Sequence, residues 1–317
     1  MNPVGASRDG YGRALLRLAV DPDVVVIEAD LGKSTKSCHF RSQHPERTIS
    51  VGIAEQNMML VGAGLAASGK KPFLSTFAIF TERAFEQVRN GIARPNLAVH
   101  ICGSHGGIHT GTDGSSAQAI EDLAIYRTLP NMTVLHPCDD NSCEYLTLQL
   151  RTFGQSSYTR TVRNVTRRIY NEEEASNLKI GEFSTLRNGQ DVGIIACGVM
   201  VEAALDAAEL LQSEGIDATV VDAHTIKPLD NATLDEISHR CGCIVTAEDH
   251  NIIGGLGGAV AEALSANNPV PLERVGVLDR FGQSGESHDL MAEYGLTSNH
   301  IVTAVRRAIA RREGNID

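Results

Sequence analysis

Short runs of apolar, β-branched residues alternate with longer stretches of helical periodicity, and this alternation limits the possible folds more than any other feature. Val24–Ile27 is one such run, and Pro72–Thr76 and Leu97–Cys102 are others. Continuous apolar runs are typical of parallel strands that are buried on both faces. Strands that alternate with helices indicate βαβ units, so the sequence predicts an α/β fold with a doubly wound, mostly parallel sheet.

The alternation breaks once, between about residues 167 and 187, where acidic residues cluster and periodicity is lost. A chain of 317 residues is long enough for two domains. We therefore predict a first domain over residues 1–168, a linker over residues 169–188, and a smaller α/β domain over residues 189–317.

Composition excludes several classes of function. The net charge of -11 argues against a nucleic-acid partner, because no basic stripe offsets it. No apolar run reaches the roughly 18 residues of a membrane span, and residues 1–9 do not have the pattern of a secretory signal. The seven cysteines lie mostly in apolar stretches without zinc spacing. We expect free thiols, no metal site in this chain and a cytoplasmic location.

Four loops follow predicted strands, where open α/β sheets bind ligands. They are Glu28–Ser37, Gly52–Asn57, Ser75–Arg83 and Gly103–Ser116. The second of these contains Glu55, which follows a strand and opens a helix rich in glycine and alanine. Glu55 is open to two interpretations, an acid facing the helix dipole or a buried general acid/base among apolar neighbours.

The other loops also carry residues with two interpretations. Residues 104–116, with His105, His109 and Asp113, contain four glycines, and this segment is as consistent with ligand binding as with a plain turn. Phe77 and Phe80 are either core residues or a stacking wall for a flat ring. The arginines at positions 160 and 163 are either solvated or an anion clamp, since arginine matches phosphate geometry.

Taken together, nine segments resemble the transketolase family of thiamine-diphosphate enzymes over nearly the whole chain. The order and the set make the resemblance specific, while any single piece would be weak. The segments are Ser7–Arg8, Glu28–Leu31, Gly52–Met58, Thr76–Phe80, Asp113–Gly114, Tyr158–Arg163, Ala247–Asn251, Gly254–Gly257 and Asp279–Glu286.

The resemblance implies that residues 1–168 form a pyrimidine-binding domain and residues 189–317 the transketolase C-terminal domain. The family's diphosphate-binding signature, Gly-Asp-Gly followed by a distant Asn, does not occur here. The chain thus resembles the C-terminal subunit of a split transketolase. Its partner would be an N-terminal subunit that carries the diphosphate-binding domain and holds Mg²⁺ or Ca²⁺. Two copies of each subunit would share the thiamine diphosphate sites.

The resemblance also assigns roles to single residues. Glu55 matches the glutamate that hydrogen-bonds N1′ of the aminopyrimidine and promotes proton transfer on the cofactor. A second group matches cofactor-binding positions: Asp30, Phe77, Phe80 and Arg83. A third group matches positions that bind the substrate: Arg8, Ser34, His105, Asp113 and Arg163, although the register could favour Arg160 over Arg163.

Two positions depart from the family pattern. Ala117 stands where transketolases typically have a histidine that contacts the substrate, and the loss of such a donor is worth about 2–4 kcal/mol. His109, in the same loop, could replace it. Arg83 stands where some members have a tyrosine. The change at Ala117 leaves the identity of the sugar substrate open, but it does not affect the assignment of the cofactor.

The resemblance implies transfer of a two-carbon ketol unit from a ketose, phosphorylated in the simplest case, to an aldose acceptor. Two enzymatic alternatives are a deoxyxylulose-phosphate-synthase-like subunit and a 2-oxo-acid-decarboxylating subunit. A third alternative, from another class, is a non-catalytic partner subunit, although the intact set around Glu55 argues against it.

Overall fold

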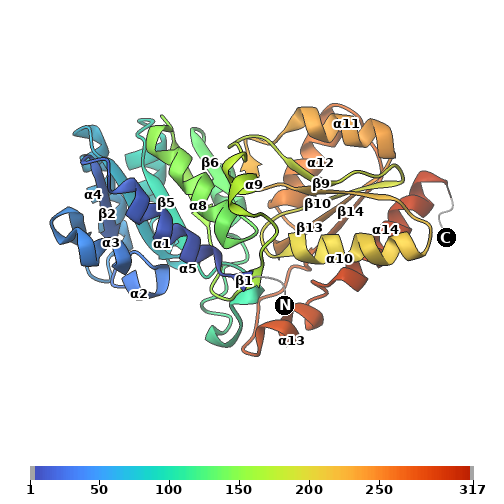
Figure 1. Cartoon of the computed structure of the whole chain (residues 1–317), viewed down its shortest axis with the longest axis horizontal. Helices are drawn as coiled ribbons and strands as arrows, with labels where there is room; N and C mark the ends of the chain where they lie inside the picture. Colours follow the sequence, from blue (N-terminus) through green and yellow to red (C-terminus); the bar gives the residue numbers. More distant parts are fainter. Residues whose placement is uncertain (1–3, 315–317) are drawn as a thin grey trace.

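The computed structural model describes residues 4–314, and these form two α/β units side by side (Figure 1). The N-terminal unit contains a seven-stranded sheet with the order β12-β6-β7-β5-β4-β2-β3. All neighbours in it are parallel except β12, which is antiparallel to β6. The strands are β2 (Val24–Glu28), β3 (Thr48–Ser50), β4 (Lys71–Phe77), β5 (His100–Ser104), β6 (Met132–Leu135), β7 (Ser156–Arg160) and β12 (Thr225–Lys227).

Helices cover both faces of this sheet, because its central strands are apolar on both sides. One face packs against α1 (Ser7–Leu18), α3 (Cys38–Gln43) and α8 (Asp140–Gln149). The other packs against α4 (Glu55–Ala67), the π-helix Val88–Ala93 and α7 (Asp122–Arg127). Residues 78–93 are divided between α5 (Ala78–Glu82), α6 (Phe85–Gln87) and that π-helix.

The C-terminal unit contains a five-stranded sheet with the order β14-β13-β10-β11-β9. The strands are β9 (Ser184–Arg187), β10 (Val192–Ala196), β11 (Ala218–Asp222), β13 (Ile244–Asn251) and β14 (Leu272–Val277). Only β9 is antiparallel to its neighbour. The core on one face includes α10 (Met200–Ser213) and α14 (Ser298–Arg312), and the core on the other includes α11 (Asn231–Cys241) and α12 (Leu256–Ala266). The α/β class with two mostly parallel sheets is therefore confirmed.

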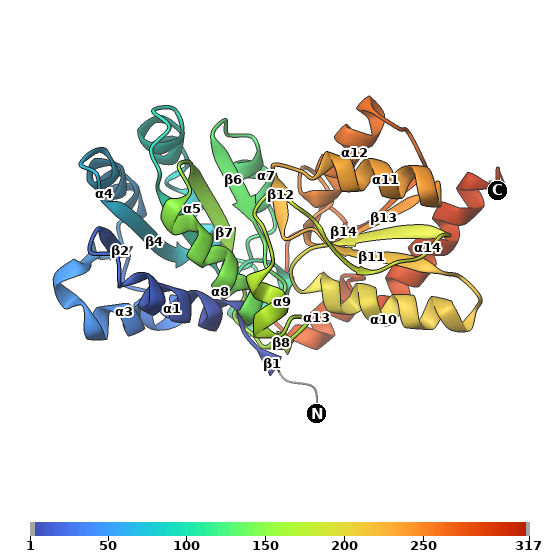
Figure 2. The same ribbon diagram turned by 45° about the horizontal axis from the view of Figure 1, so that its top comes forward.

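The two units are joined by more than one segment. Residues 169–188, predicted as a linker, contain α9 (Glu172–Ser176) and all of β9. Strand β12 follows the second sheet's β11 in sequence but extends the first sheet (Figure 2). Further short elements are β1 (Val4–Gly5), paired with β8 (Thr166–Arg167), together with α2 (Gly32–Thr35) and α13 (Ser287–Glu293). The precise domain limits remain a prediction.

Within residues 4–314, no helix combines the length and the apolar character that a bilayer crossing requires. All seven cysteines are free, and six of them are buried.

Candidate active site

The carboxyl ends of β5, β4, β2 and β3 lie along one edge of the first sheet, because these strands are adjacent and parallel. Asp30 follows β2, Glu55 follows β3, Phe77 ends β4 and His105 follows β5. Four sequence-predicted residues from four separate segments therefore lie at the same edge. This is the place where open α/β sheets bind ligands.

Glu55 is the first residue of α4 and is only 1% exposed. Neither carboxylate oxygen has a hydrogen-bond partner among the described residues. The nearest cation is Arg83, whose Nε lies 3.7 Å from Oε2, which is too long for a hydrogen bond. Buried carboxylates are normally hydrogen-bonded, since desolvation without a partner is costly. The Glu55 carboxyl can therefore accept a hydrogen bond, and none of the described residues donates one to it.

A row of stacked rings adjoins Glu55. The rings of Phe77 and Phe80 are nearly parallel, with centroids 5.6 Å apart. The His105 ring stacks on Phe77 at 3.9 Å, and the Arg83 guanidinium lies 4.8 Å from the Phe80 centroid. A continuous set of contacts thus runs from Glu55 through Arg83, Phe80 and Phe77 to His105. These flat apolar surfaces beside an unpartnered carboxyl suit a planar heteroaromatic ring with a hydrogen-bond donor or acceptor at its edge.

His105 adjoins a group of cationic residues. Burial, together with the nearby charges of Arg8 and Arg163, lowers the pKa of His105 to about 3. Burial also lowers the pKa of Arg8, whose Nη1 donates to the Ser34 carbonyl at 3.1 Å. The Arg8 Nε is buried without a partner. Four predicted substrate-binding residues therefore lie close together: Arg8, Ser34, His105 and Arg163. The unpaired N–H of Arg8 among them could donate a hydrogen bond to an anion.

Arg163 donates to Asp113 at 2.7 Å and to the Thr112 hydroxyl at 3.1 Å. Arg160, the alternative in the sequence, is fully buried and bonded to the Asp249 and Ala119 carbonyls. Its guanidinium has no free face for a ligand, whereas Arg163 is partly exposed. Of these two arginines, Arg163 is the one whose side chain is accessible to a ligand.

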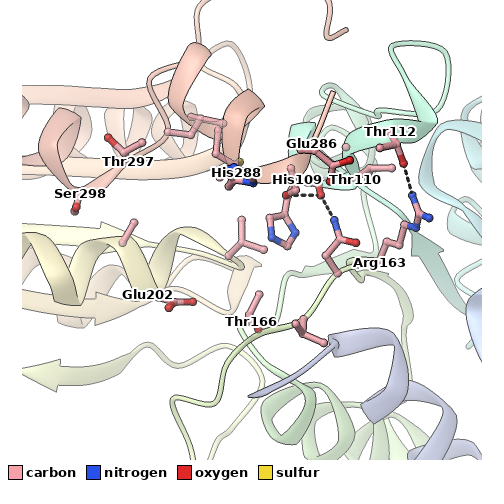
Figure 3. A pocket seen from close by; sticks show the side chains of 18 of the residues that line it. His109, Thr110, Thr112, Arg163, Thr166, Glu202, Glu286, His288, Thr297 and Ser298 are labelled. Atoms are coloured by element: carbon pink, nitrogen blue, oxygen red, sulfur yellow. Dashed lines mark hydrogen bonds between the residues drawn. The ribbon is translucent and has the colours of Figure 1, made fainter. Parts of the chain in front are cut away.

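His109 occupies a different place from His105, although both lie in the glycine loop, which we define as residues 104–118. Its side chain points into a cavity of about 690 Å³ between the two domains (Figure 3). Burial lowers the pKa of His109, and its Nδ1 has no partner among the described residues. Arg163 and Thr112 line the same cavity, opposite Glu202 and Ser298 of the C-terminal domain. Arg163 therefore belongs both to the lining of this cavity and to the cationic group beside His105.

Two predicted site residues, Asp30 and Ala117, make few contacts that bear on their roles. Asp30 is exposed, has a left-handed backbone (φ 61°) and makes no hydrogen bond or ion pair within residues 4–314. Ala117 is half-buried in the glycine loop, where its amide donates to the Gly114 carbonyl at 3.0 Å. Both lie at the predicted edge, but no contact of either residue indicates its role.

Sequence reasoning missed one residue next to the aromatic row. Glu82 closes α5 between Phe80 and Arg83, and its Oε1 is buried without a partner. Burial, together with the charges of Glu121 and Asp122, raises its pKa to about 9. The available signal was a glutamate directly after an aromatic pair at a strand end.

The fold and the site define a class of protein in which a pyrimidine-binding α/β domain is followed by a smaller C-terminal α/β domain. Residues 6–167 match the family model described as "Transketolase, pyrimidine binding domain", and residues 181–301 match "Transketolase, C-terminal domain". The chain belongs to the transketolase family.

Similar proteins include both separate subunits and longer chains. A protein of Methanocaldococcus jannaschii, provisionally named as a transketolase C-terminal section, is 42% identical over 94% of both chains. A 6-deoxy-6-sulfo-D-fructose transketolase subunit of Clostridium sp. is 41% identical over 96% of this chain and 95% of its own length. Human transketolase is 38% identical over 96% of this chain, but only 49% of its own length is covered.

A solved structure of a split-gene transketolase, in an inactive β4 tetramer, superimposes with a TM-score of 0.88 and 42% identity. The match covers 96% of this chain and 98% of that one. The matches to the Methanocaldococcus, Clostridium and split-gene proteins therefore cover more than nine tenths of this chain and of each relative's own length.

Proposed function

We propose that this chain is the C-terminal subunit of a thiamine-diphosphate-dependent transketolase that transfers a two-carbon ketol unit from a ketose to an aldose. The observation that carries the proposal is the buried, unpartnered carboxyl of Glu55 beside the stacked Phe77 and Phe80. This arrangement fits an aminopyrimidine, which offers a flat ring and a ring nitrogen at its edge. When bound, thiamine diphosphate supplies the carbanion chemistry that stabilises the transferred unit.

Glu55 holds and exchanges a proton at the edge of that ring. Its burial in an apolar setting would strengthen a hydrogen bond between Glu55 and the ring nitrogen, and Glu55 would thereby favour proton exchange on the bound cofactor. Phe77 and Phe80 orient the ring and exclude water from one side. The Arg83 guanidinium, whose Nε lies 3.7 Å from Glu55 Oε2, offsets part of the desolvation cost of a charge on Glu55.

The residues around Arg8 and Arg163 bind the anionic end of the substrate. Arginines suit tetrahedral oxyanions because they donate paired hydrogen bonds. His105, with its pKa lowered to about 3, is neutral at physiological pH and therefore contributes a hydrogen bond rather than a charge. A phosphate or a sulfonate would satisfy this set, and the sulfo-sugar relative makes both worth assaying.

A partner subunit supplies what this chain lacks in the proposed assembly. No group of His, Cys, Asp and Glu within residues 4–314 is arranged to hold a metal ion. We assign the diphosphate and its Mg²⁺ or Ca²⁺ to an N-terminal transketolase subunit, with two copies of each chain in the active complex. A cytoplasmic location is part of the same proposal.

The test is reconstitution with the N-terminal subunit and an assay with a panel of phosphorylated and sulfonated ketoses. We expect the wild-type pair to transfer a ketol unit and the Glu55→Ala pair to lose at least about 100-fold in kcat, since general acid–base contributions reach that size. Glu209→Ala, at an exposed helical site, is the matched control. Full turnover by the Glu55→Ala pair would show that the assignment of Glu55 is wrong.

A further inference from the structure

The C-terminal domain holds the glycine loop through one buried carboxylate. Asp249 lies on β13 and is 1% exposed. Its Oδ1 accepts the amide of Ile108 at 2.8 Å, and its Oδ2 accepts the amide of His109 at 2.9 Å. Both carboxylate oxygens are thus committed to consecutive amides of a loop that belongs to the other domain. Hydrogen bonds to a charged group are about twice as strong as neutral ones.

The loop has a residue that makes this approach possible. Gly107 precedes the two amides and has a left-handed backbone (φ 82°). A Cβ at position 107 would lie 2.1 Å from Asp249 Oδ2. Only glycine permits both this conformation and this distance.

Further hydrogen bonds connect the C-terminal domain with other polar groups of the loop. The Ser287 hydroxyl donates to the His109 carbonyl at 2.9 Å, and the Ser284 hydroxyl donates to the Thr112 carbonyl at 2.9 Å. The Gln118 side chain donates to the Gln283 carbonyl at 3.0 Å. Amides and carbonyls of the loop are therefore both bonded to the second domain.

Arg160 joins this attachment to the first sheet. Its Nη1 donates to the Asp249 carbonyl at 2.7 Å and its Nη2 to the Ala119 carbonyl at 2.5 Å. A single buried guanidinium thus connects β13, the residue directly after the glycine loop and β7. The geometry of the loop depends on how the two domains dock.

The glycine loop carries His105, which stacks on Phe77, and Asp113, which pairs with Arg163. We propose that Asp249 is a positioning residue that fixes this loop, so that the C-terminal domain determines the shape of the substrate site. The inference rests on the proposed function, because His105 and Asp113 bind the substrate there. A displacement of about 1 Å in such groups can lower the rate about 100-fold.

The test uses the reconstituted complex with Asp249→Asn. The asparagine keeps the shape but directs an NH₂ group at one of the two loop amides. We expect KM for the donor sugar to rise about 10-fold or more while the Kd for thiamine diphosphate changes less than about 2-fold. Hydrogen–deuterium exchange of residues 105–118 should accelerate, whereas exchange of α4 should not. Asp235→Asn, an exposed carboxylate of the same domain, is the control.

A second variant covers the case in which Asp249→Asn fails to assemble. Ser284→Ala with Ser287→Ala removes only two hydroxyls and should raise both KM and loop exchange in the same direction. Unchanged KM and unchanged loop exchange in the variants that assemble would overturn the inference. If the wild-type complex transfers no ketol unit, the proposed function fails, while the exchange measurement on the same complex still decides whether Asp249 fixes the loop.

Discussion

Glu55 Oε2 lies 3.7 Å from Arg83 Nε, and no described residue forms a hydrogen bond with either oxygen of that carboxylate. A buried acid with only a distant cation lowers the stability of the free chain. The same acid becomes useful when a ring nitrogen occupies the space beside Phe77 and Phe80. The relationship between these two residues therefore links a local cost in stability to the proposed cofactor chemistry.

Glu55→Gln should consequently stabilise the isolated chain by about 1 kcal/mol, since it removes the buried charge and keeps the shape. Thermal or urea unfolding of the chain without its partner measures this. Glu209→Gln, at an exposed position of α10, should change stability by less than about 0.5 kcal/mol. A clear loss of stability in Glu55→Gln would mean that Arg83 compensates the charge after all.

Arg160 and Arg163 should differ in how strongly the same substitution affects stability. Arg160 and its ion-pair partner Asp122, at 3.2 Å, are both fully buried. Arg160→Met leaves that carboxylate uncompensated, so we expect a loss of about 3–5 kcal/mol in the free energy of unfolding. Arg163→Met, at a partly exposed pair, should cost no more than about 1 kcal/mol but raise KM for anionic donors. Equal stabilities of the two variants would contradict this division.

His105 should make the protein sensitive to acid. Its pKa is about 3 in the folded chain against 6.5 for an unperturbed histidine, so only the unfolded state takes up a proton between these values. The contribution of His105 to the free energy of unfolding is complete above about pH 6.5 and is lost as the pH decreases toward 3. Its limiting slope is about 1.4 kcal/mol per pH unit.

His105→Asn should therefore flatten the fall in unfolding free energy between pH 6.5 and 4, as measured by denaturant titration at each pH. His288→Asn, at a side chain that is 84% exposed, is the control and should leave the slope unchanged. An unaltered slope in His105→Asn would show that His105 titrates normally in the folded chain.

Two glycine-to-alanine changes should have opposite signs. At Gly107 an added methyl group meets Asp249 at 2.1 Å on a left-handed backbone, so Gly107→Ala should destabilise the chain by about 1–3 kcal/mol. At Gly64, within α4, nothing lies within 4 Å of the added Cβ. Gly64→Ala should stabilise by about 0.5–1 kcal/mol. Thermal unfolding of both variants measures these changes. An unchanged stability of Gly107→Ala would mean that the loop can move away from Asp249.

The sequence by itself determined the layered α/β fold, because apolar runs of strand length alternate with helical periodicity. It also placed Glu55 at the start of a helix and two aromatic residues at a strand end, since these are local patterns of a few residues. Tertiary structure decided which arginine is free to bind an anion, because burial of Arg160 depends on Asp122, Ala119 and Asp249 from distant segments.

Tertiary structure also separated His105 from His109, which lie four positions apart in one loop. The first stacks on Phe77, and the second faces the interdomain cavity. Glu82 and Asp249 escaped sequence reasoning for the same physical reason. The raised pKa of Glu82 and the paired hydrogen bonds of Asp249 arise only when separate segments pack together and exclude water.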